Sequence, residues 1–218
     1  MVEFQYFIAT MEERCEIRRF LMEHFLIEET MNVATGITEE EFSPFADATL
    51  DSSLRTPFSV VCRDGSGAIA GVALSAVINR NEETISNPLG APKRPEIQAI
   101  SSICEEVHGS IWQLLDANIN IVLDLEILSV GLPHQRQGIA GKMLEKRESP
   151  PLLQEHQIQG FVCQASSHAN QMLLKNRGYQ ELKEVPFSRY VGTDNKPLIR
   201  PQDDTRAVKL FWRPYHPL

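Results

Sequence analysis

A mostly apolar run, INIVLDLEILSV at 119–130, ends at Gly131-Leu132-Pro133. Such a run is typical of a buried strand, and the glycine and proline that follow prevent the strand from continuing. The next residues suit a helix that begins at Gly138 and ends before Ser149-Pro150-Pro151. The sequence therefore predicts a long strand that turns directly into a helix, a unit that is common in α/β proteins.

Further strands and helices are predicted on both sides of this unit. Thr10 and Glu13 form a capping box, which marks the start of a helix that runs to about Phe25. Helical periodicity predicts a helix over 96–115, and a shorter helix over 170–176 is ended by Gly178. Apolar and β-branched runs predict strands over 4–8, 58–63, 68–79, 158–164, 180–185 and 207–212. This order predicts an α/β domain in which a mixed sheet has helices on both faces.

The size and the charge of the chain restrict its class. Its 218 residues match one domain, so we expect a single domain over 1–218. The 29 acidic and 21 basic residues give a formal net charge of −8, which disfavours nucleic acid and anionic membrane as partners. The four cysteines form no CxxC pair, which favours free thiols and a cytoplasmic location. The histidines lack metal-ligand spacing, so no metal is expected.

The turn before the predicted helix has the features of an anion site. Gly138, Ala140 and Gly141 let an outside group approach the backbone, where the free N–H groups and the dipole of the helix favour a diphosphate. Arg136 stands where both the Rossmann fingerprint and the P-loop require glycine, so neither nucleotide motif fits. The segment that begins at Gln135 does match the pattern Q/R-x-x-G-x-G/A.

This pattern resembles the coenzyme A pyrophosphate loop of the GNAT N-acetyltransferase superfamily. Within that superfamily the chain resembles animal arylalkylamine N-acetyltransferases, especially the insect dopamine and serotonin type, over about 20–210. The segment HFLIEETMN at 24–32 is similar to the family's F-x-x-(D/E)-E-P-(L/M)-N. The strand and loop at 126–140 and the segment PFSRY at 186–190, which is similar to P-(Y/F)-S-(K/R)-Y, follow in the same order.

The resemblance implies a GNAT-like, mostly antiparallel sheet that splays open after the long strand, with acetyl-CoA in the gap. The pantetheine amides of acetyl-CoA would pair with Leu128, Ser129 and Val130, and an N–H group near Val130 would hold the oxyanion. The pyrophosphate would lie on the N–H groups of 135–141. Arg136 and Lys142 either help to neutralise the charge of the pyrophosphate or are solvated surface residues. The implied cofactor residues of the turn and helix are Gln135, Arg136, Gln137, Gly138, Ile139, Ala140, Gly141 and Lys142.

An alkylamine acceptor needs a base, because its pKa near 10 leaves only about one molecule in a thousand as the free base at pH 7. The resemblance places the catalytic glutamate at Glu29, which follows Glu28 after the first helix. Asp124 is a second candidate. Strand alternation puts Asp124 on the same face as Glu126 and Leu128. Asp124 either acts as a base or pairs with a buried lysine or arginine.

The group that protonates the leaving thiolate is open. Many GNAT enzymes use a tyrosine four residues before the glycine of a G-(F/Y) pair, which is Gly178-Tyr179 here, and that position holds Leu174. The dopamine-type enzymes use serines in this helix, and alignment on the glycine finds Asn170 and Asn176 instead. A thiolate that leaves without an acid, or a water, is the remaining option. Asn170 is interpreted as a cofactor contact or as the N-cap of the helix.

The resemblance thus implies an acetyl-CoA-dependent N-acetyltransferase of a small arylalkylamine such as serotonin, dopamine or tyramine. We expect a monomer or a weak dimer. Direct attack by the amine, without a covalent enzyme intermediate, is expected because no cysteine or serine lies beside an evident base. Two alternatives are an acetyltransferase for agmatine, a polyamine or an amino acid, and a non-catalytic acyl-CoA-binding module.

Overall fold

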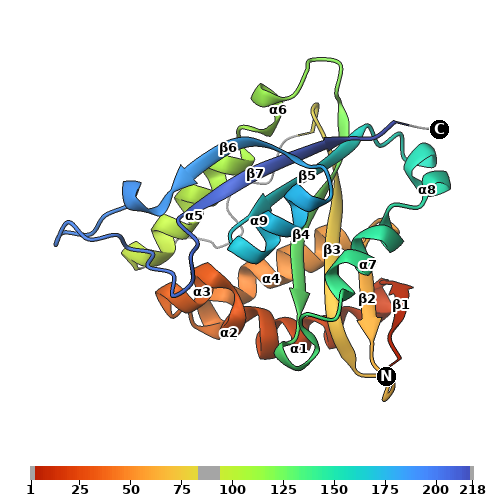
Figure 1. Ribbon diagram of the computed structural model, residues 1–218, viewed down its shortest axis with the longest axis horizontal. Coiled ribbons are helices and arrows are strands. Elements are labelled where there is room, and N and C mark those ends of the chain that lie inside the picture. Colours follow the sequence, from red (N-terminus) through yellow and green to blue (C-terminus); the bar gives the residue numbers. More distant parts are fainter. Residues whose placement is uncertain (1–2, 83–93, 217–218) are drawn as a thin grey trace.

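The computed structural model describes residues 3–82 and 94–216. They form a seven-stranded sheet in the order β1-β2-β3-β4-β5-β7-β6 (Figure 1). Neighbouring strands are antiparallel except β4 and β5, so the predicted mixed, mostly antiparallel sheet is confirmed. The predicted strands are all present, and their bounds are β1 Gln5–Ile8, β2 Val60–Arg63, β3 Ile69–Asn79, β4 Ile121–Val130, β5 Gly160–Ala165, β6 Gln180–Pro186 and β7 Ala207–Pro214.

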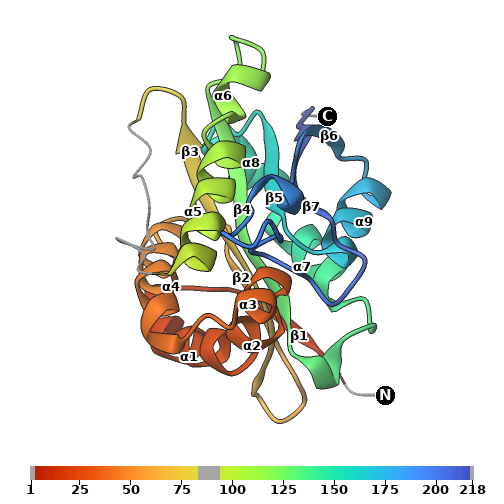
Figure 2. The same ribbon diagram turned by 90° about the vertical axis from the view of Figure 1, so that its left-hand side faces the viewer.

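Helices cover both faces of the sheet, as predicted (Figures 1 and 2). One face packs against α1, α4 and α5 in a core that includes Leu50 and Ile103. The other face packs against α7, α8 and α9 in a core that includes Met143 and Leu174. Among the described residues no helix has the length and apolar character needed to cross a membrane. The helices are α1 Arg14–Phe20, α2 Leu26–Glu28, α3 Thr30–Thr35, α4 Glu39–Ser53, α5 Pro95–His108, α6 Ile111–Leu114, α7 Ile139–Arg147, α8 Pro150–Glu155 and α9 His168–Asn176.

The helical segments differ from the prediction at several places. The N-terminal helix has the predicted capping box at Thr10, but a π-helical turn at Leu21–Phe25 joins α1 to α2. The single helix predicted over 96–115 is two helices, because Gly109, a poor helix former, ends α5 and a new helix starts after it. The helices α3, α4 and α8 were not predicted. A proline inside α4, Pro44, masks its helical signal.

The sheet opens between β4 and β5. Their parallel pairing covers only Leu123–Leu125 opposite Phe161–Cys163, although β4 continues to Val130. Beyond these pairs the two strands diverge (Figure 1). Throughout its length β4 keeps its antiparallel partner β3. The predicted splay after the long strand is therefore confirmed.

A β-bulge interrupts β4 at Glu126. Adjacent residues of β3 pair with Leu125 and Ile127, so Glu126 between them is an extra residue in the ladder. Asp124 and Glu126 both contact side chains of the helices on the α4–α5 face, whereas Leu128 packs against the opposite core. The prediction that Leu128 shares their face is wrong, because the extra residue reverses the alternation of side chains along the strand.

One arginine side chain is completely buried beneath α7. Arg147 donates from Nη1 to Ser75 Oγ at 2.9 Å and from Nη2 to Tyr179 Oη at 3.0 Å. Its guanidinium lies 5.5 Å from the centre of the Phe161 ring, and its Nε lies 3.9 Å from Glu148 Oε1. The side chain of Arg147 therefore ties the end of α7 to β3, β5 and the residue that precedes β6.

Candidate active site

The open end of β4 presents backbone donors to the gap. Gly131 N–H donates to Ala70 O at 3.0 Å, and along an antiparallel strand successive N–H groups face opposite edges. The N–H groups of Leu128 and Val130 therefore point away from β3 and toward the gap, whereas that of Ser129 faces β3. Leu128 and Val130 consequently suit the predicted pantetheine contacts, and Ser129 does not.

The turn between β4 and α7 exposes the N-terminus of that helix. Gly138 has a φ of 78°, in the left-handed region that favours glycine, and α7 begins at the next residue without a side-chain cap. The first N–H groups of α7, at Ile139, Ala140 and Gly141, have no partner within the helix. This arrangement suits a diphosphate. Ile139 can contribute only its backbone, because its side chain lies in the second core.

Gln135, which was predicted to bind the pyrophosphate, makes hydrogen bonds within the protein instead. Its N–H donates to Leu132 O at 3.4 Å within the 3₁₀ turn Leu132–His134, so this N–H is not free for an anion. Its side-chain amide donates to Glu28 Oε2 and to Val130 O, both at 3.0 Å. Gln135 therefore shapes the turn.

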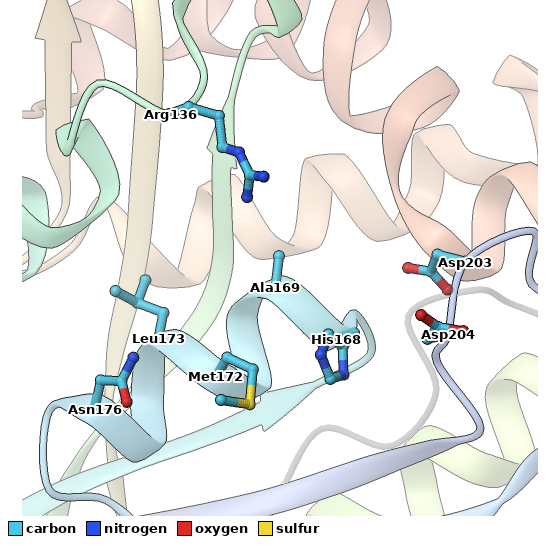
Figure 3. A pocket seen from close by; sticks show the side chains of 8 residues that line it. All are labelled: Arg136, His168, Ala169, Met172, Leu173, Asn176, Asp203 and Asp204. Carbon is cyan, nitrogen blue, oxygen red and sulfur yellow. The ribbon is translucent and has the colours of Figure 1, made fainter.

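A pocket of about 530 Å³ lies between this turn and α9 (Figure 3). Arg136 extends toward the pocket from the turn, and side chains of α9 line the opposite side. Gln137 and Lys142 are exposed at the surface. Asn176 lines the pocket, whereas Asn170, the predicted cofactor contact, is not among the lining residues. The lining residues are Arg136, His168, Ala169, Met172, Leu173, Asn176, Asp203 and Asp204.

The helix α9 begins earlier than predicted. Ser167 is its N-cap, and Ser167 Oγ accepts a hydrogen bond from Asn170 N–H at 3.3 Å. The interpretation of Asn170 as the N-cap is therefore wrong, because Ser167 takes that position. Leu174, which stands where many GNAT enzymes have a tyrosine, is fully buried in the second core.

Glu29 lies between α2 and α3, and both of its carboxylate oxygens are held. Oε2 accepts from Asn32 N–H at 2.8 Å, which makes Glu29 the N-cap of α3. Oε1 accepts from the Ser166 hydroxyl at 2.6 Å. Burial raises the pKa of Glu29, the charge of Asp203 adds to this rise, and the hydrogen bonds from Ser166 and Asn32 oppose it. A carboxylate with a raised pKa is better matched to proton transfer near neutral pH.

Ser166 is a candidate site residue that was not predicted from the sequence. It lies between β5 and α9, at the end of β5 where the gap opens. The available signal is a serine pair, Ser166-Ser167, between a predicted strand and a predicted helix. The premise that no serine lies beside a base is wrong, because the fold brings Ser166 to Glu29 from a distant part of the chain.

Asp124 is buried and pairs with a histidine rather than with a lysine or arginine. Its Oδ2 lies 2.8 Å from Nε2 of His108, at the end of α5. Burial lowers the pKa of His108, but the hydrogen bond and charge of Asp124 outweigh this and hold the pKa above its ordinary value. Glu126 accepts from Ser52 Oγ at 2.9 Å, and burial together with the charge of Asp124 raises the pKa of Glu126 to about 8. The pairing with His108 favours a structural role for Asp124.

Replacing Asp124 with asparagine is expected to change how stability depends on pH. A histidine whose pKa is raised in the folded state stabilises that state below its unfolded pKa, and this contribution disappears as the pH rises through the folded pKa. The free energy of unfolding of D124N, measured in urea, should therefore fall further below that of the wild type at about pH 5.5 than at about pH 9. A deficit that is equal at the two pH values would contradict the ion pair.

No family model matches the chain, and no curated protein matches it in sequence. Solved structures do match. Arylalkylamine N-acetyltransferase 2 from Aedes aegypti superposes with a TM-score of 0.84 at 18% identity, over 97% of this chain and 99% of that one. The Drosophila melanogaster polyamine N-acetyltransferase that forms N-acetylagmatine gives a TM-score of 0.74 at 14% identity, over 98% and 100% of the two chains.

A more distant structure, a GNAT-family acetyltransferase from Staphylococcus aureus Mu50, gives a TM-score of 0.54 at 13% identity, over 97% of this chain and 99% of that one. The likeness to these structures shows that the chain has the GNAT acetyltransferase fold, which was predicted from the three matching segments. Over residues 3–82 and 94–216, no group of three or more histidine, cysteine, aspartate or glutamate side chains is placed to hold a metal ion.

Proposed function

We propose that this protein is an N-acetyltransferase that transfers the acetyl group of acetyl-CoA to the primary amine of a small arylalkylamine. The observation that carries the proposal is Glu29, a carboxylate with a raised pKa that accepts a hydrogen bond from Ser166 beside the end of β5. An enzyme that acylates amines benefits from such a base, because its acceptor arrives as an ammonium ion. The activities named for the similar proteins from Aedes aegypti and Drosophila melanogaster support this class of reaction.

The residues around the turn fit acetyl-CoA. The uncapped N-terminus of α7 and the side chain of Arg136 suit its diphosphate, and the N–H group of Leu128 suits a pantetheine amide. When bound there, acetyl-CoA supplies an activated acetyl thioester. We assign to the N–H group of Val130 the stabilisation of the negative charge that develops on the thioester oxygen.

Glu29 moves the proton of the acceptor in this proposal. Its carboxylate removes a proton from the ammonium group, directly or through a water, and the free amine then attacks the thioester carbon. A C–N bond forms, the C–S bond breaks, and the nitrogen gives up a second proton as the amide forms. One of the two protons is released to solvent, and the sulfur leaves as a thiolate that takes up the other. We assign the return of this proton to Ser166, because its hydroxyl already contacts the carboxylate of Glu29.

A second acceptor class, agmatine or a polyamine, is favoured by Asp203, a carboxylate whose charge acts on Glu29. Asp203 lies close enough to raise the pKa of Glu29, and it also lines the pocket beside α9. An acceptor with a second cationic group would be attracted by Asp203, whereas the neutral ring of an arylalkylamine would not. An activity assay with amines of both kinds separates the two acceptor classes.

A thiol-release assay with purified protein and acetyl-CoA tests the function. The panel contains tyramine, dopamine, serotonin, agmatine, spermidine and an amino acid. The highest kcat/KM with an arylalkylamine supports the first acceptor class, and the highest value with agmatine or spermidine moves the assignment to the second. Tight binding of acetyl-CoA without turnover on any amine would identify a non-catalytic acyl-CoA-binding module and would reject the enzyme.

Replacing Ser166 with alanine is expected to move the acidic limb of the pH profile of kcat/KM to higher pH. The hydrogen bond from Ser166 lowers the pKa of Glu29, so its loss lets that pKa rise further. Because the ionised carboxylate is the active form, activity at pH 7 should fall, by about tenfold for each unit that the limb moves. Ser167→Ala, which removes only the N-cap of α9, should leave the limb in place. An S166A limb that coincides with that of the wild type would contradict this assignment.

A further inference from the structure

The carboxylate of Glu28 is bound to the turn between β4 and α7. Its Oε1 accepts from Leu132 N–H at 3.3 Å, and its Oε2 accepts from the side-chain amide of Gln135 at 3.0 Å. His24 Nδ1, one helical turn earlier, lies 3.0 Å from the same Oε1. Two of these contacts come from the turn that would hold the diphosphate, although 104 residues separate Glu28 from Leu132.

The helical segment that carries His24 and Glu28 also contacts the turn at Gly131, which has no side chain. A Cβ atom added to Gly131 would lie 3.1 Å from His24 Cε1 and 3.2 Å from its Nδ1. The histidine ring thus packs directly on the backbone at the end of β4, and the Phe20 ring lies beside it at a centroid distance of 4.7 Å. Glu28 therefore contacts the turn beside His24, which itself packs against Gly131 of the turn.

Glu29, the residue after Glu28, contacts the strand on the other side of the gap, β5. Whereas Glu28 contacts the end of β4, the carboxylate of Glu29 is bound to Ser166 at the end of β5. The paired residues of β4 and β5 end at Leu125 and Cys163, so the ladder does not hold the two ends together. Two consecutive carboxylates consequently bridge the open side of the sheet, one to each strand.

We propose that Glu28 is a positioning residue that couples the cofactor-binding turn to Glu29. The proposal rests on the proposed function, because it assigns the turn to the diphosphate of acetyl-CoA and Glu29 to the base. Glu28 fixes the turn in the shape that presents the N–H groups of α7. Through the peptide bond that it shares with Glu29, it also fixes the base against Ser166. Loss of the Glu28 contacts should therefore weaken cofactor binding and displace the base together.

Glu28→Gln is the first test variant. Glutamine keeps the size of the side chain. Its NH₂ group, however, must face one of the groups that now donate a hydrogen bond to the carboxylate, so at least one charge-assisted hydrogen bond is lost. We expect the Kd for coenzyme A, measured by isothermal titration calorimetry, to rise by about tenfold or more. The acidic limb of kcat/KM should also move to higher pH, because a displaced Glu29 loses its bond to Ser166.

Glu23→Gln is the matched control, since Glu23 is exposed on the same helical segment and its loss removes the same charge. This variant should keep the wild-type Kd and pH profile. Gln135→Met removes the opposite end of the contact without altering the helix, so it tests the proposal even if E28Q folds poorly. It should weaken coenzyme A binding in the same direction as E28Q.

Hydrogen–deuterium exchange of the free protein separates this inference from the proposed function. In E28Q, exchange should rise both at 131–137 and at 29–35, whether or not the protein binds coenzyme A. Failure of the wild type to bind coenzyme A would reject the function, while the exchange comparison would still decide the coupling. An E28Q variant with wild-type exchange in both segments and a wild-type pH profile would overturn the role of Glu28. A lower melting temperature with no shift of the limb would reduce that role to stability alone.

Discussion

Replacing Glu29 with glutamine is expected to lower kcat/KM for the amine acceptor by about a hundredfold or more, the range of general-base catalysis. Glutamine matches the size of glutamate but cannot accept the proton of an ammonium group. Its amide oxygen can still accept from Asn32 N–H, so the start of α3 should stay in place. The measurement is steady-state thiol release with the best acceptor, accompanied by a thermal melt to confirm that the variant is folded.

The effect of this variant should depend on pH in a defined direction. Because burial raises the pKa of Glu29, the wild-type kcat/KM should fall as the pH drops through that raised value, where the carboxyl group becomes protonated. E29Q should lack this limb. Glu23→Gln serves as the control for charge, because Glu23 is exposed and lies on the preceding helical segment. A wild-type kcat/KM in E29Q would transfer the role of base to Asp124 or to water alone.

Arg147→Ala is expected to cause the largest loss of stability, about 3–5 kcal/mol in the free energy of unfolding. No part of the Arg147 side chain is exposed, and its removal leaves a cavity beside Ser75 and Tyr179, whose hydroxyl groups lose their donor. It also takes a positive charge away from Glu148. Urea denaturation, followed by circular dichroism, measures the difference.

The comparison with Arg147→Met separates volume from charge. Methionine fills most of the space, and a buried ionic group replaced by an apolar side chain of similar size is often tolerated. We therefore expect R147M to lose less than about 1.5 kcal/mol. A loss in R147M as large as that in R147A would mean that the guanidinium hydrogen bonds, rather than packing, hold α7 to the sheet.

Much of the fold could be predicted because it depends on local patterns. The apolar run that ends at Gly131 gave β4 and its turn, and the Thr10 capping box gave the first helix. The bulge at Glu126 could not be predicted, since a bulge is defined by the pairing of a strand with its partner. Alternation along β4 alone therefore put Leu128 on the wrong face. In α4, Pro44 obscured a helix whose capping box at Thr38 was visible.

The candidate site was predicted only in part, because its residues meet through tertiary contacts. Glu29 was placed by a local motif, but its partner Ser166 is 137 residues away, and no pattern joins the two. The same limit applies to Asp124, whose partner His108 comes from a neighbouring helix. The sequence also cannot show that the N–H of Gln135 is already used within its own turn.

The bulge at Glu126 also determines how complete the sheet can be. Because Glu126 is an inserted residue, its removal would leave every pairing of β4 with β3 unchanged, while it would abolish the local bend that a bulge imposes. A straightened β4 could extend its ladder with β5 beyond Leu125, and the N–H group of Leu128 would then be hydrogen-bonded within the sheet. The inserted residue thus lies where the β4–β5 ladder stops, and beyond it the sheet carries an unpaired edge in its interior. A ligand with its own amides can complete this edge as a missing strand would.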